Sequence, residues 1–288
     1  MTRASLLVLA AFAAALPATD GGSMLHSERS SPGDLELGGE LAHVPQGSKV
    51  FIRYEVLLTL PQETYTVSDD PDFAPGTEIS GVPLESLARL FAMSTRDLLI
   101  VAICYDHYRA NYPSDYLAQH RPLLVLRING KLRDQWPKSP SGDALGPYLI
   151  SHPVFKPAFK ILSHSDEAQI PYGVTRLEFR KESEVFGGIR PRGFWPAKSQ
   201  VQQGYLIARQ DCFRCHNIGA EGGTMAGRTW EDLANSAWDD GPAFRDIIHN
   251  PASVNPGAKM PPHPHYDVGT LDALTSYFKT FATAGRNR

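Results

Sequence analysis

The sequence predicts a multidomain protein of mixed α+β class, in which a sheet-dominated N-terminal domain precedes an all-α C-terminal domain. Three observations carry this prediction. Residues 37–186 contain short apolar and β-branched runs separated by turn residues, a pattern that is typical of strands. Residues 187–198 hold three glycines and two prolines without periodicity, and they form a predicted linker. Residues 199–288 then space their apolar side chains at helical intervals.

Individual elements follow from local patterns. A helix is expected over residues 83–93, where leucines recur at helical spacing behind Pro83. Asn129-Gly130 favours a tight turn after a strand. The expected strands cover residues 50–60, 98–104, 122–128, 148–150 and 174–179, and the expected C-terminal helices cover residues 202–210, about 242–250 and 270–281.

Length and composition limit the possible functions. A chain of 288 residues is long enough for two domains, and its hydrophobic share of 42% supports real cores. The formal net charge of −3 argues against a nucleic-acid partner, because domains that bind nucleic acid are basic. The three cysteines, Cys104, Cys212 and Cys215, are too few for a disulfide framework.

The first residues have the pattern of a secretory signal peptide. Met1-Thr2-Arg3 is a short positive start, and residues 4–16 form an apolar run that is shorter than the roughly 20 residues needed to span a bilayer. We therefore expect residues 1–18 to be a signal peptide. We also expect the protein to be exported to the periplasm and to have no membrane span after cleavage. Residues 19–36, rich in Gly, Ser and Asp, are expected to be a flexible leader.

The chemistry is expected at Cys212-Phe213-Arg214-Cys215-His216, which has the C-x-x-C-H spacing of covalent haem attachment. Residues three apart share one face of a helical turn, so both thiols can reach the two vinyl groups of one porphyrin while the histidine reaches its iron. A thioredoxin-like pair would follow a strand in a βαβ unit, and a zinc site would need two further ligands. Neither context is evident, so we expect one covalent haem c on Cys212 and Cys215, with His216 on the iron.

Residues from about 200 to 283 resemble a class I cytochrome c. The resemblance rests on Gly204, the CFRCH pentapeptide, the glycines at 219, 222 and 223, Asn250-Pro251, the KMPP loop at 259–262 and the closing aromatic helix. It implies His216 as proximal and Met260 as distal axial ligand of the haem iron. Met225, His263 and His265 are the alternatives to Met260.

One segment departs from the cytochrome pattern. Residues 226–230 lack the proline that in this family supplies a carbonyl to the proximal histidine, and Gly227 stands near that place. Another backbone carbonyl can still serve. Trp230 and Trp238 are expected either to line the porphyrin or to pack in the core.

The N-terminal domain resembles the molybdopterin-binding domain of the sulfite-oxidase-like oxidoreductases over about 100 residues. The segments that carry the resemblance are VPLESL at 82–87, CYDHYRANYP at 104–113, LLVLRINGK at 123–131 and GPYLI at 146–150. In that family the cysteine that binds molybdenum precedes the first of these segments, but here residues 66–81 contain no cysteine. The resemblance therefore implies a related fold that has lost its molybdenum cofactor.

Other residues of this domain have two interpretations. Cys104, within an apolar run, is expected to be a small buried hydrophobe. Asp106, His107, Arg109 and His120 are expected either to line a vestigial pocket or to be solvated loop residues, and His107 stands where the family has Gly.

We therefore expect a periplasmic mono-haem c-type cytochrome that exchanges electrons with a redox partner protein. Its N-terminal domain would serve for docking or as a scaffold, and the chain would be an electron-transfer protein or subunit rather than an enzyme by itself. The alternative is a sulfite-dehydrogenase-like molybdenum/haem oxidoreductase. A haem-based sensor is a third possibility, which would need a readily displaced Met260.

Overall fold

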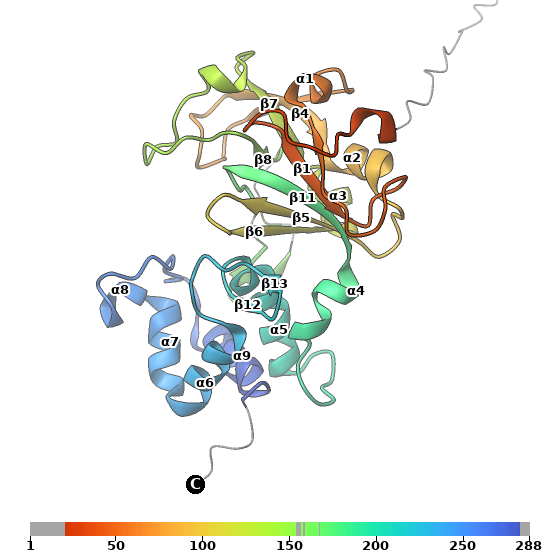
Figure 1. Ribbon diagram of the computed structural model, residues 1–288. Helices are drawn as coiled ribbons and strands as arrows, with labels where there is room; N and C mark the ends of the chain where they lie inside the picture. The colour runs from red at the N-terminus through yellow and green to blue at the C-terminus, as the bar shows by residue number, and fades with distance from the viewer. Residues whose placement is uncertain (1–20, 154–156, 158, 167, 283–288) are drawn as a thin grey trace, which may run out of the picture.

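The structure, a computed structural model, describes residues 21–153, 157, 159–166 and 168–282. The chain mixes sheets and helices and forms two lobes (Figure 1). We call residues 21–186 the sheet lobe and residues 187–282 the helical lobe, in each case for the described residues. The expected signal peptide lies outside the described residues. Within the described part of the chain, no helix is long and apolar enough to cross a membrane.

Two sheets form the sheet lobe. The strands of the five-stranded sheet lie in the order β2 (Val50–Ile52), β1 (Leu35–Gly39), β11 (Val174–Lys181), β5 (Leu98–Cys104) and β6 (Arg109–Pro113). In this sheet β1 pairs with β11 in parallel, and the other pairs are antiparallel. The strands of the four-stranded antiparallel sheet lie in the order β3 (Glu63–Val67), β4 (Thr77–Pro83), β7 (Leu123–Ile128) and β8 (Leu149–Ser151). The helices of this lobe are η1 (Gly21–Met24), α1 (Tyr54–Leu57), α2 (Leu84–Phe91), α3 (Ser114–His120), η2 (Arg133–Gln135) and α4 (Glu182–Val185).

The helical lobe is built on the crossing of α5 (Gln200–Gln210) and α9 (Val268–Lys279). Side chains cap its helices: Ser199 accepts a hydrogen bond from the Gln202 amide, and Thr229 and Asp232 form a capping box. Its other elements are η3 (Gly187–Ile189), η4 (Cys212–Arg214), β12 (Asn217–Ile218), β13 (Glu221–Gly222), α6 (Trp230–Asp239), α7 (Gly241–His249) and α8 (Pro251–Val254).

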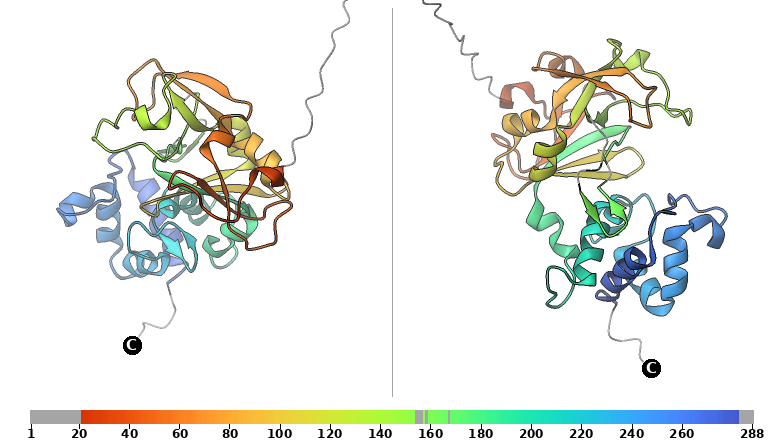
Figure 2. Two further views of the ribbon diagram at one scale, coloured as in Figure 1. Left: turned by 45° about the horizontal axis from the view of Figure 1, so that its top comes forward. Right: turned by 180° about the vertical axis from the view of Figure 1, so that it is seen from behind.

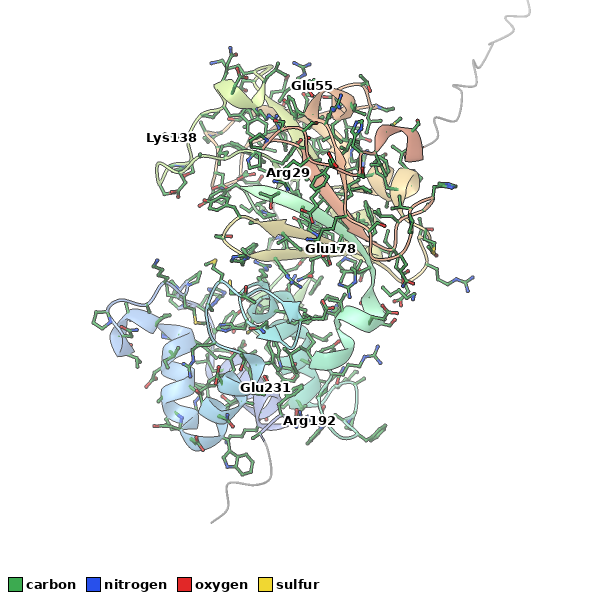
Figure 3. All side chains as sticks on the ribbon, viewed as in Figure 1. Arg29, Glu55, Lys138, Glu178, Arg192 and Glu231 are labelled. Atoms are coloured by element: carbon green, nitrogen blue, oxygen red, sulfur yellow. The ribbon has the colours of Figure 1, made fainter. Side chains whose placement is uncertain are left out.

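Strand β5 connects the cores of the two lobes. Successive side chains of a strand point to opposite faces of the sheet. Accordingly, Ile100 and Ala102 pack in the core of the sheet lobe, while Leu99 and Val101 pack with the core of the helical lobe. Figure 3 shows side chains of both lobes meeting below this sheet, with Glu178 on the sheet side. The lobes therefore share an apolar interface.

A hairpin of the sheet lobe extends onto the helical lobe. It consists of β9 (Lys160–Ile161) and β10 (His164–Ser165), which pair in antiparallel fashion. At its turn, the Ser163 amide donates to Oγ1 of Thr270 at 3.0 Å, next to the start of α9. Seen from behind, the hairpin lies between the sheets and the helices (Figure 2).

Most predicted elements are confirmed to within a few residues. Residues 98–104 form β5, residues 123–128 form β7, and the helices expected near 83–93, 202–210, 242–250 and 270–281 are α2, α5, α7 and α9. The turn at Asn129-Gly130 has the expected positive φ at both positions, 49° and 72°.

Two predictions were wrong. The strand expected over residues 50–60 ends at Ile52, and the chain turns into α1, where Tyr54 and Leu57 are buried one helical turn apart. The flexible leader expected at 19–36 is structured from Gly21 onward. His26 exchanges backbone hydrogen bonds with Phe51, so edge pairing orders a segment whose composition alone favoured disorder.

The predicted linker, residues 187–198, packs partly against the helical lobe. Ile189 is fully buried, and its carbonyl accepts a hydrogen bond from the Tyr277 hydroxyl at 2.5 Å. Phe194, in contrast, is 94% exposed, and residues 192–198 as a whole are exposed.

Candidate functional site

The two cysteines of the motif lie on a tight turn at the end of α5. Residues Cys212–Arg214 form the 3₁₀ helix η4, and the Cys212 carbonyl accepts hydrogen bonds from the amides of Cys215 at 3.2 Å and His216 at 3.0 Å. Both thiols are free and partly exposed. Phe213 between them is fully buried and anchors the turn in the core. The turn thus presents two thiols and an imidazole within five consecutive residues.

His216 is held in one orientation by the backbone. Its side chain is buried, and Nδ1 lies 2.9 Å from the carbonyl oxygen of Arg228 and donates to it. Burial lowers the pKa of His216, and the Arg228 carbonyl only partly offsets this effect. The ring is therefore neutral near pH 7 and has Nε2 for a metal, as an orienting hydrogen bond to a ligating histidine requires. The carbonyl comes from Arg228, one residue after the Gly227 that marks the place in the sequence.

The thiols do not have the electrostatics of a redox pair. Burial raises the pKa of Cys212 well above its usual value. Burial also raises the pKa of Cys215, to about 11, although the Arg214 guanidinium opposes it. A catalytic C-x-x-C pair has a lowered thiol pKa, and these two cysteines do not share that feature. In the described ranges, no group of three or more His, Cys, Asp or Glu side chains gathers as it would around a metal ion.

The glycines after the motif let the chain return closely against it. A Cβ atom at Gly223 would lie 1.8 Å from the Arg214 carbonyl oxygen. Gly222 has a φ of +89°, and a Cβ atom there would lie 2.5 Å from the His216 carbonyl oxygen. No other residue type fits either position without moving the backbone of the motif.

Met260 and its rivals have different surroundings. Met260 is half-buried and packs against the core of the helical lobe, as Cys212 does. His263 stacks on the ring of Tyr266, with centroids 4.7 Å apart, and its Nε2 lies 3.6 Å from Oδ2 of Asp211. His265 is exposed and meets the same tyrosine edge-on, and Met225 is 42% exposed.

The two tryptophans are separated by burial. Trp230 is fully buried and contacts the rings of Phe213, Tyr277 and Phe278, so it is a core residue. Trp238 is 54% exposed.

Three candidate residues of the sheet lobe lie either in its core or against the helical lobe. Cys104 is 4% exposed within β5, and burial raises the pKa of its thiol, as expected for a core side chain. Arg109 pairs with Glu221 of the helical lobe at 3.6 Å, and the His107 carbonyl accepts from the Thr224 amide at 3.3 Å. Arg109 and His107 therefore contact the segment that follows the motif.

His120 belongs to a buried polar network that sequence patterns did not reveal. Its Nε2 lies 2.8 Å from Oδ2 of Asp166. The network continues through Gln210, His164 and Tyr266 to Asp211, which precedes Cys212. Its members come from positions between 120 and 266, so no local spacing in the sequence predicts this network.

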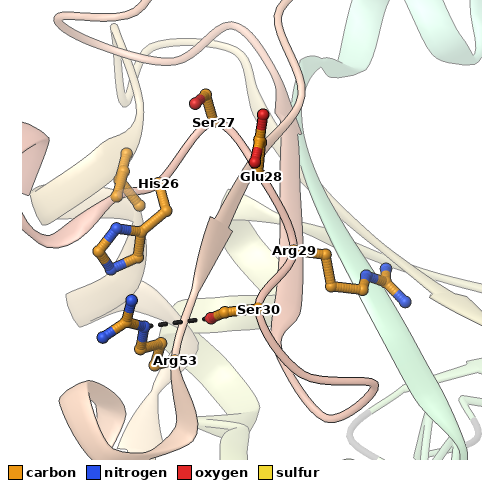
Figure 4. A pocket seen from close by; sticks show the side chains of 7 residues that line it. His26, Ser27, Glu28, Arg29, Ser30 and Arg53 are labelled. Atoms are coloured by element: carbon orange, nitrogen blue, oxygen red, sulfur yellow. Dashed lines mark hydrogen bonds between the residues drawn. The ribbon is translucent and has the colours of Figure 1, made fainter.

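A shallow hollow of the sheet lobe lies apart from these elements. It is lined by residues 25–30 and Arg53, whose Nε donates to Oγ of Ser30 at 3.2 Å (Figure 4). None of the predicted site residues lines it.

Comparison with known proteins gives little. The chain matches no protein-family model and no curated protein. Similar solved structures include the sulfane dehydrogenase SoxCD from Paracoccus pantotrophus, with 14% sequence identity and a TM-score of 0.33. The match covers 54% of this chain and 40% of that one, so the chain spans well under half of its length.

Proposed function

We propose that the protein is an exported mono-haem c-type cytochrome that transfers single electrons to or from a redox partner protein. The observation that carries this proposal is the hydrogen bond from Nδ1 of His216 to the Arg228 carbonyl, directly after two free thiols on one turn. This hydrogen bond leaves Nε2 of a neutral imidazole as the atom that can bind a metal beside the thiols. This donor set fits a haem held by two thioether bonds and a proximal histidine.

Each residue has a role in this proposal. Cys212 and Cys215 attach the haem, His216 is the proximal ligand, and Met260 is the distal ligand. Haem supplies reversible one-electron transfer at its iron when bound. His216 and Met260 would hold the iron and would leave no place on it for water or substrate, so the proposed role is electron transfer.

The sheet lobe serves in this proposal as a docking or scaffold domain of the sulfite-oxidase-like type without its molybdenum cofactor. The burial of Cys104 supports this, because a thiol inside a core strand is not placed to bind a metal. The alternative is a molybdenum/haem oxidoreductase in which this lobe oxidises a small substrate.

We propose the periplasm as the compartment of the protein from its first 18 residues. Attachment of haem to reduced thiols and the signal-like residues 1–18 together favour the periplasm. The proposed partners are redox proteins, not nucleic acid.

The test is covalent haem. Protein purified from a periplasmic expression host should keep one haem per chain after acid–acetone extraction, because thioether bonds resist it. Cys212→Ala with Cys215→Ala should abolish this, while Cys104→Ala should keep it. Haem retained by the double variant, or no covalent haem in the wild type, would refute the proposal. Metal analysis should find iron, whereas molybdenum in equal amount would favour the oxidoreductase.

A further inference from the structure

The hydrogen bonds of Tyr266 show that Nδ1 of His164 carries a hydrogen. The Tyr266 hydroxyl donates to Oδ2 of Asp211 at 3.0 Å. Its oxygen also lies 2.6 Å from Nδ1 of His164. A hydroxyl has only one hydrogen, and Asp211 takes it, so Nδ1 of His164 must be the donor in the second bond.

The hydrogen bonds of Gln210 show that Nε2 of His164 also carries a hydrogen. Its amide nitrogen, which can only donate, gives a hydrogen bond to Oδ1 of Asp166. Its amide oxygen therefore faces Nε2 of His164 at 2.5 Å, and that nitrogen must donate as well. Only the imidazolium form of histidine donates from both ring nitrogens. His164 is fully buried, and the carboxylates of Asp166 and Asp211 stand at the two ends of the chain of hydrogen bonds.

We propose that His164 is a buried imidazolium through which the sheet lobe holds the haem-attachment turn and raises the reduction potential of the haem. His164 is thus a positioning residue, since it acts through Tyr266 and Gln210. Its effect on the potential rests on the proposed function. A positive charge beside the haem-attachment turn would favour the reduced state of a haem held there, since that state has one positive charge fewer.

Several charged groups share this environment. Asp211 faces Arg214 at 3.8 Å and His263 at 3.6 Å, and Asp166 faces His120 at 2.8 Å. Burial raises the pKa of Asp211, but Arg214, His263, His164 and the Tyr266 hydroxyl outweigh it, so the pKa lies below its usual value. The Asp211 carboxylate therefore stays ionised beside Cys212 and accepts the hydrogen bond from the Tyr266 hydroxyl. His263 is therefore the control for a charge effect that does not come from His164.

The charge of His164 can be tested without reference to the haem. Nitrogen NMR of the full chain with 15N-labelled histidine, near neutral pH, should show both ring nitrogens of His164 carrying hydrogen. The His164→Asn variant assigns the signal, because it removes that resonance alone. A neutral His164 ring, with one bare nitrogen, would overturn the proposal.

The potential is the second test, on the holoprotein near neutral pH. His164→Asn keeps a donor to Tyr266 but has no charge, so its reduction equilibrium constant should be roughly tenfold lower than that of wild type. His263→Gln, which changes the other histidine beside Asp211, should keep the wild-type potential.

The outcomes separate the two proposals. If haem is attached and His164→Asn keeps the wild-type potential, or His263→Gln lowers the potential as much as His164→Asn does, the inference fails and the cytochrome assignment stands. If no haem is attached, the assignment and the effect on potential both fail, and the NMR result alone decides the charge.

Discussion

Gly204 of α5 lies directly against the backbone of α9: a Cβ atom at residue 204 would stand 2.1 Å from the carbonyl oxygen of Ala273. The same atom would lie 2.7 Å from Cβ of Tyr277, whose ring is fully buried. Helix α5 leads straight into the cysteine turn, so this close crossing positions the motif relative to the C-terminal helix.

Gly204→Ala should therefore destabilise the helical lobe by about 3 kcal/mol, since backbone must move to admit one methyl group. Urea unfolding followed by circular dichroism measures this. Gly269→Ala is the matched control: it lies in α9, and Oδ1 of Asp267 would be 3.6 Å from the new Cβ, which is an ordinary contact. It should be neutral or stabilising by up to about 1 kcal/mol. Equal effects of the two changes would mean that the helices cross differently.

If Met260 holds the haem iron as proposed, Met260→Ala should free a coordination position on that iron. The loss of a thioether that favours ferrous iron should lower the reduction equilibrium constant on the order of a hundredfold or more, and carbon monoxide should bind the reduced protein rapidly. Redox titration and CO-binding kinetics measure both, and covalent attachment should persist.

Met225→Ala is the control for this change, because Met225 is exposed and lies nearer the motif in sequence. It should leave both properties as in wild type. If instead Met260→Ala changes neither, and oxidised wild type lacks the near-infrared sulfur-to-iron band, His263 or His265 would be the distal ligand.

Glu221→Gln should loosen the contact between the lobes. Glu221 accepts a hydrogen bond from Arg180 at 2.7 Å and pairs with Arg109 at 3.6 Å, with about a quarter of its side chain exposed. Its loss should cost about 1–2 kcal/mol, between the values for exposed and buried ion pairs, and less at high salt. Glu85→Gln, which removes an exposed i,i+4 pair with Arg89, should cost under about 0.5 kcal/mol. A loss at Glu85 as large as that at Glu221 would contradict a fixed contact between the lobes.

Acid stability should depend on Asp211. Its pKa is lower in the folded chain than in the unfolded one, so the carboxylate stabilises the fold above its unfolded pKa of about 3.9. This stabilisation is lost as the pH falls through the lower, folded-state value. Asp211→Asn should thus be less stable than wild type near pH 7, and the difference should shrink on acidification. Thermal unfolding at a series of pH values measures it, and a pH-independent difference would exclude this origin.

Export should remove the first residues. The mature N-terminus of protein from a periplasmic fraction should lie between residues 16 and 19, after the apolar run. N-terminal sequencing gives the answer directly. An intact Met1 in a soluble cytoplasmic fraction would contradict export.

The sequence by itself determined the local features of this protein. The C-x-x-C-H motif needs only five adjacent residues, of which Cys212–Arg214 form the helical turn η4. Helices α5, α7 and α9 and strands β5 and β7 were predictable, because apolar periodicity and runs are carried by neighbouring residues. The prediction of strand beyond Ile52 failed because a short β-favouring run does not distinguish a strand from a buried helical turn.

Only the tertiary structure decided what surrounds the motif. The partner of His216 is a backbone carbonyl, which any residue type provides, so no side chain identifies it in the sequence. His164 and Tyr266 are 102 residues apart, and Arg180 and Glu221 are 41 apart, so neither pair leaves a periodic signal. Such contacts depend on how two folded surfaces meet, and they give the cysteine turn its electrostatic environment.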